Sequence, residues 1–594
     1  MRRHHELPFG AEAVAGGVRF RLWAPAAQAV ALSLEGAVAL PMRREEGGWF
    51  TLVTDAARVG SRYRFLVDGF AVPDPASRHQ PEDVHGPSEV IDARSYDWGD
   101  AAWQGRPWEE IVLYELHTGS FSERGDFAGV ASRLDHLVEL GVTAVELMPV
   151  ADFPGRRNWG YDGALLFAPD ARYGRPDSLK RLVDAAHGRG LAVFLDVVYN
   201  HFGPEGNYLH RYAPAFFTER HHTPWGAAID FTVPEVRRFY IENALYWLEE
   251  FNIDGLRFDA VHAILDDSPK SILVELAETI RAAFAGRRPV HLVLENDKNE
   301  ARLLAPGLFT AQWSDDIHHG LRVLTSGAHE GYYADYAANP AGRLGRALAE
   351  GFAYQGERSE HRDAPRGEPS AHLPPTRFIG FIQNHDQVGN NAFGTRLSKL
   401  AAPQTIRVAA AVLLLSPEIP LLFMGEEWGA EQPFPFFCDF GRELAETVRE
   451  GRRREFAGFP EFRDPEARSR IPDPCAAETF ASAVLDWTTL RRPPHDDWLN
   501  WYKEMLALRR REIVPRLVGA PGGAGQWRGL GERALEVSWR MGDGSLLWLY
   551  ANFAAEPVPL PAPPRGRLLH ATGTPEATAL APRSVAFFLE ESPA

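Results

Sequence analysis

Clusters of polar and charged residues follow short apolar runs at five places in the chain, and they are the first candidates for chemistry. Charged groups at the ends of buried strands are costly to desolvate. One such cluster is readily explained as a structural ion pair, but five that converge on one face favour a functional site. The clusters are Asp196-Val-Val-Tyr-Asn-His201, Arg257-Phe-Asp-Ala-Val-His262, Glu295-Asn-Asp297, Asp315-Asp-Ile-His-His319 and Asn384-His-Asp386.

Carboxylates within these clusters fit the chemistry of glycoside hydrolysis. Its oxocarbenium-like transition state needs an anionic carboxylate beneath the anomeric carbon and a second carboxyl group that protonates the leaving oxygen. Arg257 lies two residues before Asp259, so on a strand both side chains point to the same face. A guanidinium beside Asp259 would hold it ionised as a nucleophile. Glu295, at the end of an apolar run, is better placed for the acid/base role.

The histidines raise the alternative of a metal site. His221-His222 and His318-His319 are adjacent pairs, and adjacent side chains on a strand point to opposite faces. Neither pair makes a ready chelate, so the sequence predicts no metal and no cofactor. We interpret His201, His262 and His385 as hydrogen-bond donors to sugar hydroxyls, although a buried structural role explains His262 equally well.

The apolar runs themselves predict the scaffold. Continuous apolar runs indicate strands buried on both faces, and alternation with helices indicates parallel pairing. Helical periodicity occurs between the runs, for example at 177–189 and 235–250. The runs lie at residues 111–114, 144–148, 191–195, 255–258, 290–294, 309–313, 377–382 and 419–424. Eight of them predict an α/β protein with a (β/α)₈ TIM-type barrel, whose active site lies at the carboxyl ends of the strands.

Both ends of the chain have a different pattern. Short alternating segments separated by turns predict an N-terminal β-sandwich over residues 1–90. A Pro-rich stretch leads from it into the catalytic barrel, which we place at 91–515. Strand-like segments return afterwards and predict a small antiparallel β domain at 516–594. The Gly-rich stretch 519–525 lacks the Lys-Ser/Thr of a P-loop and is interpreted as a connector.

Composition limits the partners. The chain has 594 residues, 63 of them basic and 80 acidic, and a formal net charge of −17. This charge argues against binding to nucleic acid or to anionic membranes, whereas a neutral sugar is unaffected by it. The 67 aromatic residues could include platforms for sugars (Trp 16, Tyr 16, Phe 35), although most are expected in the core.

The cysteines and the N-terminus bear on location. Cys438 and Cys475 are the only two cysteines, which fits a reducing compartment without a disulfide framework. No apolar segment follows the first arginines, and two prolines and a glutamate interrupt the most apolar stretch, 408–424. Neither a signal peptide nor a membrane span is predicted. We expect a cytoplasmic protein.

Four motifs resemble the signature regions of the α-amylase family of glycosyl hydrolases, in the family order. They are Asp196-Val-Val-Tyr-Asn-His201, Gly255-Leu-Arg-Phe-Asp-Ala-Val-His262, Leu294-Glu295 and Gln383-Asn-His-Asp386. The resemblance covers essentially the whole chain, including the N-terminal sandwich. It implies the barrel fold, a retaining mechanism and an α-glucan substrate.

The resemblance also implies roles for individual residues. Asp259 matches the nucleophile, Glu295 the proton donor and Asp386 the transition-state stabiliser. Tyr161, in Asn158-Trp-Gly-Tyr-Asp162, matches an aromatic platform under the sugar at the cleavage point. The other expected substrate-binding residues are Asp162, Asp196, His201, Arg257, His262, Asp315, Asp316, His318, His319, His385, Gln387 and Asn390.

Stretches between the motifs narrow the choice within the family. The segments 147–155, 199–207, 311–319, 381–390 and 423–427 are similar to members that release trehalose from malto-oligosyltrehalose. That resemblance implies malto-oligosyltrehalose and related α-glucans as partners. Glycogen branching enzymes share the sandwich and the Trp-Gly-Tyr element and are the alternative. A non-catalytic glucan-binding protein is a remote alternative, because all three carboxyls are present. The sequence leaves open whether calcium binds near Asn200.

Overall fold

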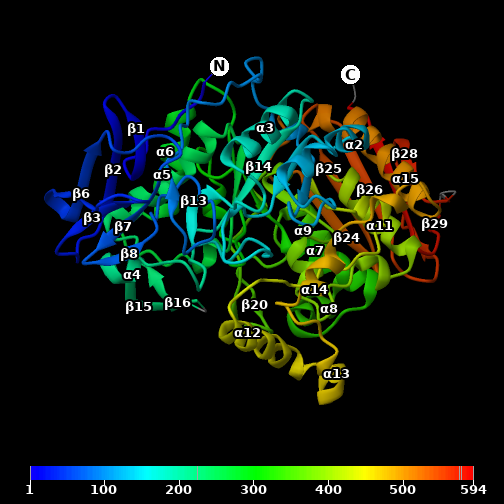
Figure 1. Ribbon diagram of the computed structural model, residues 1–594. Helices are drawn as coiled ribbons and strands as arrows, with labels where there is room; N and C mark the ends of the chain where they lie inside the picture. Colours follow the sequence, from blue (N-terminus) through cyan, green and yellow to red (C-terminus); the bar gives the residue numbers. More distant parts are fainter. Residues whose placement is uncertain (1, 224, 574–575, 577, 593–594) are drawn as a thin grey trace.

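Eight parallel strands form a closed barrel at the centre of the chain (Figure 1). The computed structural model describes residues 2–223, 225–573, 576 and 578–592. All eight predicted runs are confirmed as barrel strands, each within two or three residues of its expected bounds. In barrel order the strands are β10 (Leu113–Leu116), β11 (Ala144–Leu147), β14 (Ala192–Val197), β17 (Gly255–Phe258), β18 (His291–Leu294), β19 (Ala311–Trp313), β22 (Phe378–Gly380) and β23 (Ile419–Phe423).

Apolar side chains fill the barrel and explain its uninterrupted strand sequences. A separate hydrophobic cluster includes Leu113, Phe194, Val293, Ile379 and Leu421, which come from five different strands and are fully buried. Barrel interiors are packed in this way by layers of side chains from alternating strands. The polar residues of the five clusters therefore begin where this apolar filling ends.

Helices surround the barrel, and they return the chain from the carboxyl end of one strand to the amino end of the next. They are α2 (Leu134–Leu140), α3 (Pro176–His187), α5 (Pro234–Glu250), α6 (Ile272–Phe284), α7 (Asp315–Ser326), α9 (Pro340–Glu350), α11 (Pro403–Leu415) and α15 (His495–Leu508). Four of them begin with proline, whose fixed φ and missing N–H suit the first helical turn. Between β18 and β19 the helical part is only the 3₁₀ turn η5 (Ala301–Leu304), so the barrel departs there from strict alternation.

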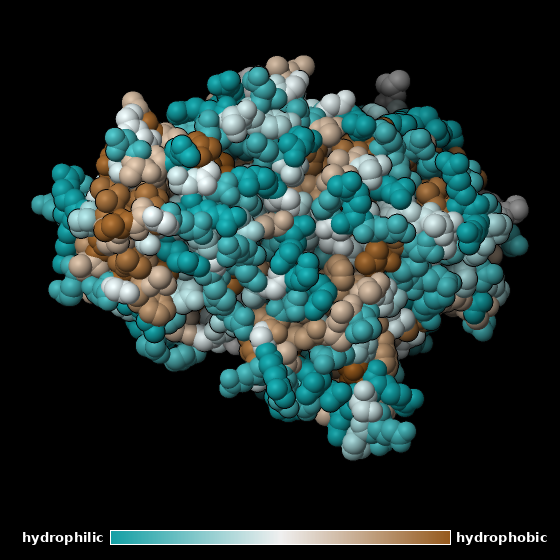
Figure 2. Space-filling model, viewed as in Figure 1, coloured by the Kyte–Doolittle hydropathy of each residue, from teal (hydrophilic) through white to brown (hydrophobic). Residues whose placement is uncertain are grey.

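The predicted N-terminal β-sandwich is confirmed. One sheet holds β1 (Gly10–Val14), β2 (Gly17–Trp23), β6 (Trp49–Thr54) and β5 (Arg43–Arg44); the other holds β4 (Leu40–Pro41), β3 (Val30–Leu34), β7 (Arg62–Val67), β8 (Phe70–Val72) and β9 (Ser88–Glu89). The sandwich docks on α5, where Phe9 packs edge-on against Phe239 at 5.5 Å and Arg78 contacts Glu250 at 3.6 Å. Figure 2 shows hydrophobic residues gathered over these strands, at the left.

The predicted antiparallel C-terminal domain is also confirmed. Its sheet has the order β24 (Gly525–Gly531), β25 (Ala534–Arg540), β26 (Leu546–Asn552), β30 (Ser584–Glu590) and β28 (Arg567–Ala571). It packs on α9, where a Cβ on Gly345 would lie 2.9 Å from the ring of Trp527. Trp539 Nε1 donates to the Leu348 carbonyl at 2.9 Å. The domain limits at 90 and 515 stay proposals.

Smaller elements sit on the connections between strands and helices. They are β12 (Ala151–Asp152) with β13 (Leu165–Pro169), β15 (Phe217–Thr223) with β16 (Gly226–Ile229), β20 (Arg358–Ser359) with β21 (Ala364–Pro365), α1 (Phe127–Ala131), α4 (Leu209–Tyr212), α8 (Ala334–Ala337), α10 (His385–Gly389), α12 (Arg442–Glu455), α13 (Pro465–Ser469) and α14 (Ala477–Ala483). The apolar stretch 408–424 is divided between α11 and β23. Among the described residues, no helix has the length and apolar character needed to cross a membrane.

Candidate active site

Arg257, which precedes the last residue of β17, lies at the centre of the polar clusters. One guanidinium nitrogen, Nη1, donates to Asp196 Oδ2 at 2.7 Å and to Asp259 Oδ1 at 3.0 Å. The other, Nη2, lies 2.9 Å from Glu295 Oε2. The guanidinium also covers the ring of Trp313 at 4.1 Å. Arg257 is fully buried, so it supplies a fixed positive charge to three carboxyl groups.

The backbone after β17 brings Asp259 and Glu295 together. Ala260 has φ 40° and ψ 48°, a left-handed conformation that is unfavourable for alanine. The turn aims the Ala260 N–H at Glu295 Oε2, 2.8 Å away. Asn200 Nδ2 donates to Asp259 Oδ2 at 2.8 Å and to the Asp259 carbonyl at 3.0 Å. Both carboxylates are thus held by neighbours, as a preorganised site requires.

The expectation for Glu295 was incomplete. Its position at the end of an apolar run suggested apolar surroundings, but Arg257 and the Ala260 N–H both contact its carboxyl group. These contacts could not be read from local sequence, because the residues come from a different strand.

His385 is a buried cation beside Asp386. Its Nδ1 donates to Glu115 Oε1 at 2.5 Å, and its backbone N–H donates to Glu115 Oε2 at 3.0 Å. Its Nε2 lies 3.6 Å from Asp386 Oδ1. Burial lowers the pKa of His385, but the charges of Glu115 and Asp386 outweigh burial and raise it to about 9. The imidazolium form, in which both nitrogens carry hydrogen, prevails at neutral pH.

Tyr161 connects two parts of the site. Its hydroxyl donates to Asp196 Oδ2 at 2.6 Å, and its ring stacks on His385 with centroids 5.0 Å apart. Burial raises the pKa of Asp196 to about 7 despite the opposing charge of Arg257. His201 Nε2 donates to the Tyr161 carbonyl at 2.9 Å. Because burial lowers the pKa of His201 to about 4, this histidine is neutral at pH 7.

A cavity of about 260 Å³ opens beside these groups. Seven predicted residues line it: His262, Glu295, Asp315, His319, Asp386, Gln387 and Asn390. The Asp386 side chain is 36% exposed, so its carboxylate faces the cavity. Asn390 Nδ2 donates to Asp386 Oδ1 at 3.1 Å. Burial and the charge of Glu295 raise the pKa of Asp315, which favours its protonated, hydrogen-donating form.

Other predicted binding residues lie away from this cavity. Asp316 is fully buried, and both of its oxygens accept hydrogen bonds within the protein, including those from Arg366 Nη1 at 2.9 Å and the Ala353 N–H at 2.7 Å. His318 is bonded to the Ile382 carbonyl at 2.9 Å. Asp162 accepts from Asn158 Nδ2 at 2.7 Å. Asp316 and His318 therefore have a structural role behind the residues that line the cavity.

Several residues of the site were not predicted. Trp225, at the tip of the β15–β16 hairpin, stacks on His201 with centroids 4.0 Å apart and is 49% exposed. Glu115 directly follows the first apolar run and could have been noted there as a carboxylate. Asp297 belongs to the cluster after the fifth apolar run, although no role was predicted for it. The remaining cavity residues sit in long connections without a local signal: Tyr332, Asp335, Tyr336, His361, Arg362 and Arg366.

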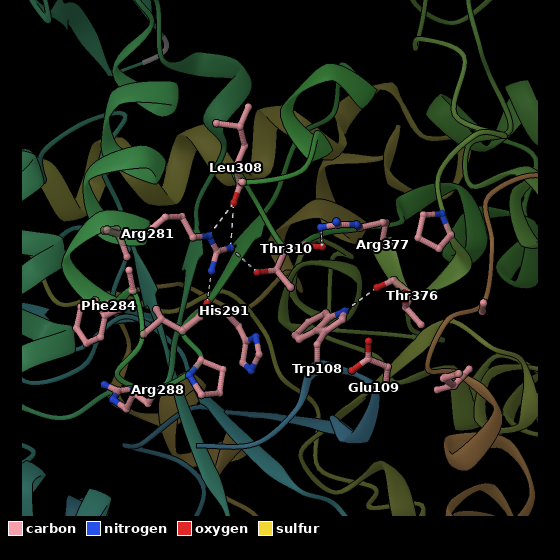
Figure 3. A pocket seen from close by; sticks show the side chains of 18 of the residues that line it. Trp108, Glu109, Arg281, Phe284, Arg288, His291, Leu308, Thr310, Thr376 and Arg377 are labelled. Atoms are coloured by element: carbon pink, nitrogen blue, oxygen red, sulfur yellow. Dashed lines mark hydrogen bonds between the residues drawn. The ribbon is translucent and has the colours of Figure 1, made fainter. Parts of the chain in front are cut away.

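A larger cavity of about 640 Å³ lies at the opposite, amino end of the barrel (Figure 3). Its lining includes Trp108, Arg281 and Arg377, and both arginines donate hydrogen bonds to the protein itself. Arg281 donates to the Leu308 carbonyl at 2.9 Å and to Thr310 Oγ1 at 2.8 Å, and Arg377 to two backbone carbonyls. In barrels this face supports stability rather than chemistry, so its size does not make it the active site.

The structure also describes the histidine pairs considered as metal ligands. His221 Nε2 lies 3.0 Å from Asp267, and His318 and His319 have separate partners. Among the described residues, no group of three or more His, Cys, Asp or Glu side chains is arranged to hold a metal ion. The metal-free mechanism stays a prediction.

Comparison with known proteins distinguishes the trehalose-releasing enzymes from the glycogen branching enzymes. Family models match residues 105–223 (alpha amylase, catalytic domain), 8–82 (carbohydrate-binding module 48, isoamylase N-terminal domain) and 522–587 (a domain of unknown function, DUF3459). A malto-oligosyltrehalose trehalohydrolase of Saccharolobus solfataricus is 42% identical over 85% of this chain and 87% of its own. Another, of Deinococcus radiodurans, is 41% identical over 96% and 94%. The chain belongs to the malto-oligosyltrehalose trehalohydrolase family.

Membership of the trehalohydrolase family makes the chain a glycosidase of the α-amylase type and confirms the predicted resemblance. A glycogen branching enzyme of Aliivibrio fischeri is 35% identical, but over only 42% of this chain and 39% of its own. A crystal structure from Salmonella typhimurium, named provisionally as an alpha amylase, superposes with a TM-score of 0.94 at 47% identity, over 98% of this chain and all of the other. Paenibacillus barengoltzii pullulanase (TM-score 0.72, 21% identity, 99% and 95% coverage) shares the fold.

Proposed function

We propose that this protein hydrolyses the α-1,4 bond next to the terminal trehalose of malto-oligosyltrehalose, releasing trehalose and a malto-oligosaccharide. The observation that carries the proposal is the single guanidinium of Arg257 in contact with both Asp259 and Glu295 at the open end of the barrel. Two carboxyl groups around one sugar-sized position are what a glycosidase needs. The family relatives supply the expected leaving group, trehalose.

In the first step, Asp259 attacks the anomeric carbon of the glucose next to trehalose. Arg257 and Asn200 hold the attacking carboxylate in place. The bond to the leaving oxygen breaks as Glu295 gives that oxygen its proton, so trehalose leaves neutral. In the second step, Glu295 takes a proton from water, and the water oxygen displaces Asp259 from carbon. The configuration is retained after two inversions.

Asp386 and His385 bind the sugar at the cleavage point in this proposal. Asp386 accepts hydrogen bonds from ring hydroxyls that strengthen as charge develops in the transition state. His385 donates from Nε2 because Glu115 occupies its Nδ1. Tyr161, stacked on His385, offers its ring as the platform.

The cavity beyond Glu295 is proposed to receive trehalose. Asp315, His319, Gln387 and Asn390 line it and supply donors and acceptors for hydroxyl groups. Tyr332 adds an aromatic face that is 40% exposed. Glu426, on the loop after β23, is absent from this cavity's lining; it is buried and bonded to Tyr502 at 3.2 Å.

Product analysis tests the proposal. Malto-oligosyltrehalose should yield free trehalose, and a malto-oligosaccharide of equal length should be cleaved more slowly. New α-1,6 branches in amylose, without trehalose release, would instead establish the branching reaction. We also propose that the protein is cytoplasmic and has no nucleic-acid partners, which the two free thiols and the net charge of −17 support.

A further inference from the structure

Two cysteines that are far apart in sequence meet in the fold. Cys438 and Cys475 are separated by 37 positions, yet their Sγ atoms lie 3.5 Å apart. The Cys438 N–H donates to the Pro474 carbonyl at 3.0 Å, so the two backbones run together at this point. Both thiols are free. The two sulfurs are therefore in contact, and a disulfide bond would bring them to about 2.05 Å.

The chain between these cysteines forms an excursion from the body, defined here as residues 439–474. It contains α12 and α13, which project at the lower edge in Figure 1. Cys438 stands where the excursion begins and Cys475 where it ends. We call the contact between Cys438 and Cys475 the neck of the excursion.

The excursion and its neck contact the wall of the active site. Phe437, beside Cys438, packs edge-on against Trp159, whose ring meets His385 at 5.5 Å. Arg452 on α12 donates to the Gly389 carbonyl at 2.6 Å, at the end of the helix that begins with His385. Arg452 belongs to the excursion, so opening of the excursion would loosen its contact with the Gly389 carbonyl.

The two thiols differ in a way that suits stepwise oxidation. Cys438 is fully buried, whereas Cys475 is partly exposed. Either sulfur can donate across this contact, and a hydrogen bond from the Cys438 thiol lowers the pKa of Cys475 to about 7. Cys475 is thus the thiolate that an external reagent meets first, and Cys438 is the resolving thiol.

We propose that Cys438 and Cys475 form a reversible disulfide that closes the neck of the excursion when the protein meets a small-molecule disulfide. The Cys475 thiolate attacks one sulfur of the reagent, forming a mixed disulfide and releasing one thiolate. Cys438 then loses its proton and attacks Cys475 Sγ, releasing the second thiolate. Two cysteine thiols are oxidised and the reagent is reduced to two thiols, which carry the two protons.

Oxidised glutathione is the probe for the test. Reduced full-length protein is incubated with it at neutral pH, and its intact mass should fall by two hydrogen atoms with no glutathione attached. A peptide map should show residues 438 and 475 linked within one chain, and dithiothreitol should reverse the change. Trypsin cleavage at the arginines of α12 should slow several-fold on oxidation, because the closed neck limits opening of the excursion.

Cys475→Ser is the matched control, in which oxidised glutathione should give no protection from trypsin. Three results would overturn the proposal: two thiols that still react with an alkylating agent after treatment, a stable glutathione adduct on Cys475 with Cys438 free, or a bond between two chains. An internal disulfide that leaves trypsin cleavage unchanged would overturn closure of the neck.

Discussion

Arg257 Nη1 lies 3.0 Å from Asp259 Oδ1, and the two residues are separated by only one position on the end of β17. This short spacing places a buried cation beside the proposed nucleophile. Nη2 of the same guanidinium contacts Glu295. One side chain thereby organises both proposed reacting carboxyl groups, and their separate roles can be tested one at a time.

Asp259→Asn removes the proposed nucleophile with little change in shape. We expect turnover to fall by roughly three to six orders of magnitude, as it does when a covalent nucleophile is lost. Circular dichroism and thermal unfolding control for folding, because Arg257 loses a buried partner. A variant that keeps near-native turnover would exclude Asp259 from this role.

Glu295→Gln removes the proposed proton donor. A substrate whose leaving group needs no proton, such as an α-maltosyl fluoride, should recover most of the rate of the first step, whereas malto-oligosyltrehalose should not. Single-turnover kinetics on both substrates measure the difference. An equal loss on both would contradict the acid role of Glu295.

Glu115→Gln should narrow the pH range of activity. Glu115 helps to raise the pKa of His385 to about 9, and Nε2 can donate to a sugar only while His385 is an imidazolium. Activity should therefore persist up to about pH 9 in the native protein. In the variant the basic limb should move to lower pH by about one unit or more. Glu418→Gln, at a site remote from the cavity, is the control with an unchanged profile.

Glu418→Gln should change stability rather than activity. Glu418 is buried before β23, no side chain among the described residues donates a hydrogen bond to it, and burial raises its pKa to about 8. Because this folded-state pKa lies above the ordinary glutamate value of 4.5, the stability that Glu418 contributes is complete below about pH 4.5 and is lost as the pH rises to about 8. Each pKa unit corresponds to about 1.4 kcal/mol, so the variant should be a few kcal/mol more stable at pH 8.

Denaturant unfolding of both proteins at pH 4.5, 6 and 8 measures this effect. The native protein should lose stability relative to the variant across that range. Parallel curves at all three pH values would mean that Glu418 does not titrate with a raised pKa in the folded state.

Local sequence predicted the barrel strands and the side chains at their ends. Arg257 and Asp259 could be paired from a spacing of two, because alternation along a strand fixes which face each residue occupies. The partnership of Glu115 with His385 joins residues 270 positions apart, and no local pattern indicates it. Asp315 and Asp316 lie in one polar cluster, but helical geometry in α7 turns Asp316 into the interior and Asp315 toward the cavity.

The cysteines illustrate the same limit. The sequence suggested a protein without a disulfide framework, and the separation of the two cysteines along the chain gives no pairing signal. Only the fold of the excursion brings them to 3.5 Å. Trp225 on His201 is likewise a consequence of how the β15–β16 hairpin folds over the site.

Proton NMR of malto-oligosyltrehalose hydrolysis in its first minutes tests the central claim most directly. One spectrum reports both the released product and the configuration of the new reducing end before mutarotation. A retaining trehalohydrolase predicts free trehalose together with the α-anomer of the malto-oligosaccharide. Initial β-anomer would contradict Asp259 as nucleophile, and new α-1,6 signals without trehalose would contradict the proposed hydrolysis.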